Sequence, residues 1–250
     1  MTTRPLAGIR VLDLTNVLAG PFACHQLAHL GAEVIKVEAV GRGDLARNLG
    51  SDPDLNAAGM GISFLAQNAG KKSSTLNLKD PDGKALLKRL VATAEVLVEN
   101  FRPGVMARLD LDYPRLKAIH PSLIYCAISG FGQDGPWVSR PAYDQIIQGA
   151  SGLMSVTGDG DSAPLRVGSP IADTVGGLTA AMAINAARPS AVSGRAWFKS
   201  PSARASKFSN AAASKRRRTT TWARDKRAAF SSKLGFSVVA PTRVTVPSST

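Results

Sequence analysis

The side chains able to bind a metal or attack a substrate are few and scattered along this sequence. Cys24 and Cys126 lie far apart and show neither the spacing of a metal site nor that of a disulfide framework. His25 and His29 are four residues apart, which suits two ligands on one helical face, but no carboxylate completes that pattern. We therefore expect no metal site and a reducing, cytoplasmic location.

Asp173 stands at the start of TVGGLTAAMAINAA, a segment of small residues with helical character. Aspartate is favoured at the N-cap of a helix, where its carboxylate accepts hydrogen bonds from free N–H groups of the first turn. Its position alone therefore favours a capping role for Asp173. A helix N-terminus would also keep such a carboxylate ionised, as a nucleophile requires.

The segments around these residues alternate between strand and helix patterns. Residues 8–14, GIRVLDL, are rich in branched apolar side chains and suit a buried strand. A helical pattern follows, with Pro21 in its first turn and Gly31 at its end, before the strand-like segment 34–37. A strand, a helix and a strand with short connections form a βαβ unit, which implies a parallel sheet.

The same alternation continues to residue 187. Strand patterns recur at 74–78, 95–98 and 123–129, and helical patterns at 81–90, 113–119, 143–154 and 174–187. Asp80 and Pro81 provide a cap and a first-turn proline for the first of these helices. The expected fold class is α/β, a Rossmann-like parallel sheet with helices on both faces.

The formal net charge of +13 lies entirely in the last quarter of the chain. Residues 188–250 hold 14 of the lysines and arginines and a single acid, Asp225, whereas residues 1–187 are balanced. The run 215–218, KRRR, is typical of a nucleic-acid patch, but it stands among 12 serines without any helical stripe. We expect a disordered basic tail. A short extended piece at 238–240 has no evident strand to pair with.

Five segments, in order, resemble the class III CoA-transferase family, which includes formyl-CoA and carnitine CoA-transferases. They are PLAGIRVLDLTNVLAGPFACHQLAHLGAEVIKVE (5–38), KKSSTLNLKDPDGKALLKRLVATAEVLVENFRPGVMARL (71–109), ISGFGQDGPW (128–137), AYDQIIQGASGLMSVTG (142–158) and PIADTVGGLTAAMAI (170–184). Each segment alone is moderately specific, and five in the same order are strong evidence. The resemblance covers nearly all of residues 5–187.

The resemblance implies that Asp173 is a covalent nucleophile, because it matches the family's catalytic aspartate. It implies transfer of CoA between an acyl-CoA and a carboxylic acid through an aspartyl intermediate. Coenzyme A is then a substrate, and no permanently bound cofactor is expected. Tyr143 and Asp144 match positions that line the substrate pocket of family transferases.

For CoA itself, the resemblance points to the loop after the first strand and to basic side chains. The loop residues are Val17, Leu18 and Ala19, at the carboxyl end of a strand, where α/β folds bind ligands. Leu18 stands where several family transferases have a glutamine that contacts CoA. Arg108 matches a residue that meets the CoA phosphates, and Lys72 with its neighbour Lys71 could act similarly.

Two alternatives to a transferase stay open. The related α-methylacyl-CoA racemases have a histidine where this chain has Tyr143, and tyrosine is a poor proton acceptor at neutral pH. The transferase is therefore preferred. The other alternative is an inactive fragment whose basic tail binds nucleic acid, a partner that we do not expect.

The resemblance also predicts how the chain is organised. We expect residues 1–187 to be the N-terminal part of the family's large domain and residues 188–250 to be a low-complexity tail of frameshift origin. Family members are longer and interlock as homodimers, so this chain is expected to be truncated and to lack parts needed for activity. No apolar run reaches membrane-spanning length, and we expect no membrane partner.

Overall fold

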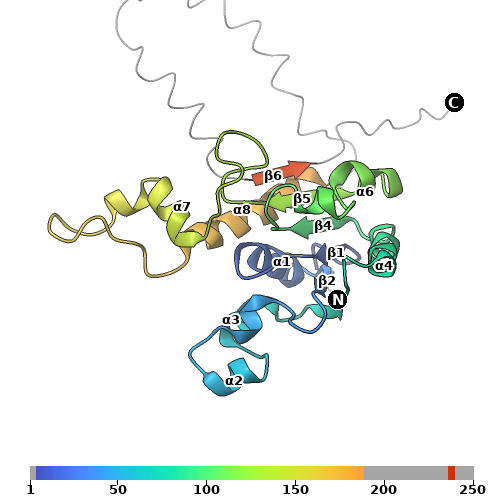
Figure 1. The fold of residues 1–250 in the computed structure, drawn as a ribbon, viewed down its shortest axis with the longest axis horizontal. Helices are drawn as coiled ribbons and strands as arrows, with labels where there is room; N and C mark the ends of the chain where they lie inside the picture. Colours follow the sequence, from blue (N-terminus) through green and yellow to red (C-terminus); the bar gives the residue numbers. More distant parts are fainter. Residues whose placement is uncertain (1–3, 189–235, 240–250) are drawn as a thin grey trace, which may run out of the picture.

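A six-stranded sheet forms the centre of the protein (Figure 1). The computed structural model describes residues 4–188 and 236–239. Its strands are β1 (Arg10–Asp13), β2 (Glu33–Glu38), β3 (Lys72–Thr75), β4 (Val96–Glu99), β5 (Ile124–Ile128) and β6 (Phe236–Val239). In the order β3-β2-β1-β4-β5-β6 the first five pair in parallel, and β6 joins β5 in the antiparallel direction. The predicted α/β class with a parallel sheet is confirmed.

Helices cover both faces of the sheet because its central strands are apolar on both sides. On one face, Val11 and its neighbours pack against α1 (Ala19–His29) and α8 (Ile171–Ala187). On the other, Leu12 and its neighbours pack against α4 (Pro81–Val91), α5 (Val105–Arg108) and α6 (Tyr113–Ile119) (Figure 1). Successive side chains on a strand point to opposite faces of the sheet, so each central strand contributes to two separate hydrophobic cores.

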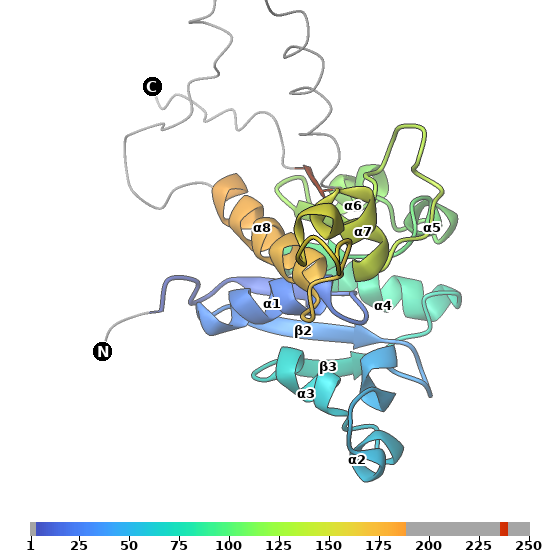
Figure 2. The same ribbon diagram turned by 90° about the vertical axis from the view of Figure 1, so that its left-hand side faces the viewer.

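The order of the strands creates a switch point between β1 and β4. From β1 the chain moves outward to β2 and β3, and then returns past β1 to build β4 and β5 on its other side. In open α/β sheets ligands bind beyond the carboxyl ends of the strands at such a point. The beginnings of α1 and α8 lie near this edge, together with α7 (Asp144–Ala150) (Figure 2).

Small residues let α1 and α8 pack very closely. Gly176, Gly177 and Ala180 of α8 are buried, and a Cβ added at Gly177 would overlap the backbone carbonyl oxygen of Ala19. The two helices lie side by side in both views (Figure 2). This contact places the first turn of α8 next to the first turn of α1.

Several boundaries differ from those expected. The predicted strand 74–78 is β3 at Lys72–Thr75, whose exposed side chains carry no apolar pattern, whereas Leu76 and Leu78 follow it and pack beneath α4. The predicted helix 143–154 ends at Ala150, because Gly152 adopts a left-handed conformation before the 3₁₀ turn η2 (Leu153–Val156). Between residues 45 and 68 lie η1 (Leu45–Asn48), α2 (Pro53–Ala57) and α3 (Ile62–Asn68), which were not predicted.

Most of the predicted tail lies outside the described residues. Of residues 188–250, the structure describes Arg188 and the four residues of β6. The expectation that the extended piece near residue 238 has no partner was wrong, since β6 pairs with β5. Within the described ranges, no helix is both long and apolar enough to cross a membrane.

We predict that Gly177→Ala destabilises the protein by about 1–3 kcal/mol, because the new methyl group overpacks the contact between α1 and α8. Urea unfolding followed by circular dichroism measures the change. Gly149→Ala in α7 is the matched control, since its added Cβ would meet only Met154 Sδ at 3.8 Å. Equal stability of the Gly177→Ala variant and the wild type would contradict the close packing of these helices.

Candidate active site

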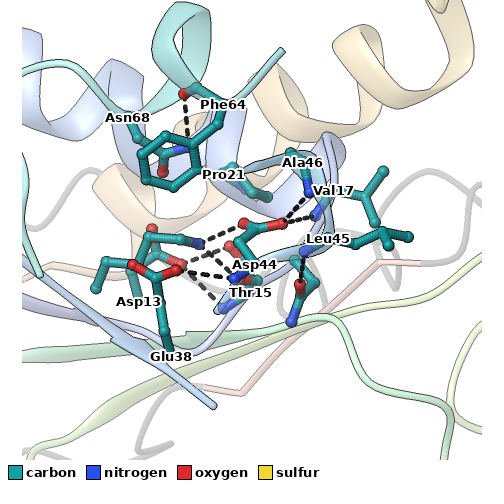
Figure 3. A network of polar contacts seen from close by, with 12 residues as sticks. Asp13, Thr15, Val17, Pro21, Glu38, Asp44, Leu45, Ala46, Phe64 and Asn68 are labelled. Carbon is teal, nitrogen blue, oxygen red and sulfur yellow. Dashed lines mark hydrogen bonds and ion pairs between the residues drawn. The ribbon is translucent and has the colours of Figure 1, made fainter. Parts of the chain in front are cut away.

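The loop after β1 is held in an unusual conformation. Val17 has a φ of 68°, in the left-handed region that β-branched residues rarely adopt. Its N–H donates to Asp44 Oδ1 at 3.0 Å (Figure 3). The N–H of Asn16 donates to Asn100 Oδ1 at 2.8 Å. Asn100 Nδ2 in turn donates to the carbonyl oxygen of Asn16 at 2.7 Å. Specific side-chain contacts therefore fix the loop that leads into α1.

Two buried ion pairs lie beneath this loop. Lys36 Nζ lies 2.8 Å from Asp44 Oδ2 and also donates to the carbonyl oxygen of Thr15. Lys71 Nζ lies 2.8 Å from Asp13 Oδ2. Burial raises the pKa of Asp13, but Lys36 and Lys71 outweigh that effect and hold it below its ordinary value. Lys71 is thus engaged inside the protein and is not free to meet a CoA phosphate.

Asp173 lies in a cavity of about 120 Å³ at the switch point of the sheet. The walls come from the start of α1, the ends of β4 and β5, and the starts of α7 and α8. They are formed by Ala19, Asn100, Ile128, Ser129, Gly130, Ala142, Tyr143, Ile147, Ala172, Asp173 and Gly176. The half-buried carboxyl group of Asp173 is the one acidic group in this lining.

The helix α8 begins at Ile171, three residues earlier than predicted, so Asp173 belongs to its first turn and does not cap it. Asp144 takes the capping role. Its Oδ1 accepts from the N–H groups of Ala172 at 2.8 Å and Asp173 at 3.2 Å. The expectation that Asp173 is the cap was therefore wrong, because the buried carboxyl group of Asp144 on α7 accepts the hydrogen bonds from the free N–H groups of this turn.

The pKa of Asp173 is raised to about 6, first by burial and then by the charge of Asp144. The sequence led us to expect that the helix N-terminus would favour the ionised form, and that expectation was wrong in direction. A group with this pKa is about nine tenths ionised at pH 7. A carboxylate raised to about 6 is more basic than an ordinary aspartate and can still attack a carbonyl carbon near neutral pH.

Tyr143 and Asp144, both predicted to line a substrate pocket, lie next to Asp173 but differ in what they face. Tyr143 immediately precedes α7 and lines the Asp173 cavity, with 64% of its surface exposed. Asp144 is buried and turned toward the first turn of α8. Tyr143 is thus placed to meet a ligand, whereas Asp144 acts on the protein itself.

A second, larger cavity of about 650 Å³ opens beyond the ends of β1, β2 and β3. Three basic residues line it, Arg42, Lys79 and Arg108, together with apolar side chains such as Leu76, Leu78 and Val105. Asn16 lies in this wall and is hydrogen-bonded to Asn100 in the wall of the Asp173 cavity. This pair connects the two cavities across the end of the sheet.

The predicted CoA-binding residues fall into different places. Arg108 lines the larger cavity and Ala19 the Asp173 cavity, while Val17 and Leu18 form the loop before α1 without lining either one. Lys72 lies at the opposite, amino end of β3, where it is exposed and pairs with Glu33 at 2.6 Å. The structure does not bring Lys72 to the other candidate residues.

Sequence reasoning missed several residues of the two cavities, namely Asn16, Asn100, Arg42 and Lys79. The two asparagines shortly follow the ends of β1 and β4, so polar residues beyond strand ends were a usable signal.

His25 and His29 contact each other with Nε2 atoms 2.9 Å apart. Among the described residues, no group of three or more His, Cys, Asp or Glu could hold a metal ion.

Fold and site together define an α/β protein with a half-buried carboxyl group of raised pKa at the switch point and a basic cavity beside it. The chain belongs to CoA-transferase family III, whose sequence pattern matches residues 6–195. The family predicted from the five segments is thereby confirmed.

Named relatives support the same membership. The succinate–glutarate CoA-transferase of Agrobacterium fabrum is 47% identical over 186 residues, which are 73% of this chain and 46% of that protein. The acetyl-CoA:oxalate CoA-transferase of Acetobacter aceti is 47% identical over 175 residues, 70% of this chain and 44% of that protein. A CAIB/BAIF family protein from Brucella suis has a similar structure, with a TM-score of 0.69 and 42% identity over 74% of this chain and 49% of that one. The chain spans less than half the length of each.

We predict that Asp173→Asn is more stable than the wild type at pH 7 and that the difference disappears toward pH 4. The folded pKa of Asp173 lies above its unfolded value, so ionisation costs stability as the pH rises from about 4 to about 6. An asparagine at position 173 stays neutral beside Asp144 at every pH, so it avoids this cost. Thermal unfolding across this pH range tests the prediction, and a stability gap independent of pH would contradict it.

Proposed function

We propose that this chain takes part in transferring CoA between an acyl-CoA and a carboxylic acid, with Asp173 as the covalent carrier. The observation that carries the proposal is the Asp173 carboxyl group in a cavity at the switch point, linked through Asn100 and Asn16 to a basic cavity. The relatives' names support the reaction class.

The chemistry proceeds by exchange of one bond for another. The Asp173 carboxylate attacks the thioester carbon of the acyl-CoA, the C–S bond breaks, and CoA leaves as the thiolate while a mixed anhydride forms. The thiolate then attacks the aspartyl carbonyl and releases the donor's carboxylate, which leaves CoA bound to Asp173 as a thioester. An acceptor carboxylate repeats these steps in reverse and departs as the new acyl-CoA.

The larger cavity suits the nucleotide part of CoA. Its size and mixed walls fit an aromatic, phosphorylated group, and Arg42, Lys79 and Arg108 supply positive charge for phosphates. Asn16 and Asn100 then mark the path of the pantetheine arm toward Asp173. Lys72 plays no part in this arrangement because it lies at the other edge of the sheet.

The walls of the Asp173 cavity favour a transferase over a racemase. A racemase needs a second group that accepts the α-proton near neutral pH. Tyr143 stands beside Asp173, and neither of the two cavities is lined by a histidine. The substrate pairs to test first are those in the relatives' names, succinate with glutarate and acetyl-CoA with oxalate.

A homodimer, as in the family, is also part of the proposal. Val175, Leu178 and Met182 form an exposed apolar stripe along α8, with Met182 65% exposed. Contiguous exposed apolar surface is typical of an interaction site. The stripe runs from the turn that contains Asp173, so a second subunit there would adjoin the site.

We predict that incubation with succinyl-CoA adds the mass of CoA less one water to the protein and that Asp173→Asn abolishes the adduct, because an amide cannot attack the thioester. Intact-protein mass spectrometry measures the adduct. Both the 250-residue chain and a chimera, in which residues 6–187 replace the matching part of the Agrobacterium relative, should be assayed. Asp161→Asn, in an exposed loop, is the control and should leave the adduct unchanged. A chimera that exchanges CoA normally with Asp173→Asn would exclude the covalent role.

We predict that Arg108→Gln weakens CoA binding about fivefold, from the loss of about 1 kcal/mol for one exposed phosphate contact. Isothermal titration with CoA gives the affinity. Lys72→Gln is the matched control, since it removes one positive charge from the opposite edge of the sheet. Equal losses in the two variants would indicate a general charge effect and contradict a phosphate site at Arg108.

A further inference from the structure

Gln148 is a buried polar residue next to the proposed nucleophile. It lies on α7 one turn after Asp144, and its surface is 0% exposed. A polar side chain in such a place must satisfy both its donor and its acceptor. Gln148 does not line the Asp173 cavity, so its contacts show what it does.

Both ends of the Gln148 amide are engaged. Its Oε1 accepts from the N–H of Val167 at 2.8 Å, and its Nε2 donates to Asp144 Oδ2 at 2.5 Å. A backbone N–H can only donate, so the oxygen of the amide has to face Val167. The NH₂ group then has to face Asp144, and the orientation of the amide is fixed by the fold.

The contacts of Asp144 fix the position of its carboxyl group in turn. Oδ2 accepts from Gln148, and Oδ1 accepts from the N–H groups of Ala172 and Asp173. These partners are all donors, and a carboxyl group that accepts from every side is stabilised as the carboxylate.

We infer that Gln148 is a positioning residue that holds the Asp144 carboxyl group as an acceptor at the first turn of α8 and so keeps its negative charge beside Asp173. The same Gln148 amide links Val167, in the loop before α8, to the Asp144 carboxyl group by hydrogen bonds. The inference deepens the proposed function and rests on it for its catalytic meaning.

The surroundings of Asp173 agree with this division of roles. The titratable groups that face it are Asp144 and Tyr143, both from the start of α7, while α1, β4 and β5 contribute uncharged walls. Burial and the fixed charge of Asp144 together raise the pKa of Asp173 to about 6. A more basic carboxylate is a better nucleophile, so Gln148 would act on the reaction without touching the substrate.

The test is the titration of the Asp173 side-chain carboxyl carbon, followed by ¹³C NMR in the 250-residue chain and assigned with Asp173→Asn. In the wild type we expect a midpoint near pH 6. In Gln148→Met the midpoint should fall by about one pH unit, because Asp144 loses the donor that holds its carboxyl group beside Asp173. Gln145→Met, at an exposed position on the same helix, is the matched control and should titrate like the wild type. An unchanged midpoint in Gln148→Met would overturn the inference.

If Gln148→Met fails to fold, Gln148→Glu decides the question. The new glutamate should keep its proton at pH 7, because Asp144 requires a donor there, and should titrate above pH 6. A new glutamate that titrates near pH 4 would overturn the inference. The titration needs no turnover. A chimera that exchanges CoA normally with Asp173→Asn would therefore reject the proposed function, while a Gln148-dependent shift in the 250-residue chain would still support the role of Gln148.

Discussion

The buried ion pair between Lys36 and Asp44 is the interaction on which the site depends. Both side chains are almost fully buried, and removal of one partner from such a pair typically costs about 3–5 kcal/mol, because the other charge stays uncompensated. Burial lowers the pKa of Lys36, but Asp13 and Asp44 outweigh burial and raise it, so the lysine stays charged. Asp44 then holds Val17 in its left-handed conformation, which directs the chain into α1. Without this pair, the loop before α1 would keep its contacts with Asn100 but lose the one that holds Val17.

The second constraint is the close approach of α1 and α8. Gly177 leaves no room for a side chain against Ala19, and the contact brings the first turn of α8 to the end of the sheet. The N–H groups of that turn are satisfied by Asp144 from α7. Three helices that are distant in sequence thereby produce a half-buried aspartate beside a fixed negative charge, which is the physical reason for its raised pKa.

The two cavities share one support. Asn100 follows the end of β4, and its side chain makes two hydrogen bonds with the backbone of Asn16, in the loop between the Asp173 cavity and the basic one. Neighbouring parallel strands end at the same edge, so residues 84 positions apart meet there. A ligand long enough to span both cavities would pass this asparagine pair.

The sequence by itself determined the parallel sheet, the helices on both faces and the family, because periodic apolar residues and ordered motifs are local signals. It also placed Asp173, Tyr143, Ala19 and Arg108 in cavity walls through motif matching. Only the tertiary structure decided the burial, the charged neighbours and the hydrogen-bond partners of these residues. That Asp144 and not Asp173 caps α8, that Lys71 is buried in an ion pair, and that β6 pairs with β5 each depend on segments meeting from far apart in the chain. Such contacts set the electrostatic environment and the strand pairing, and local sequence patterns do not predict contacts between distant segments.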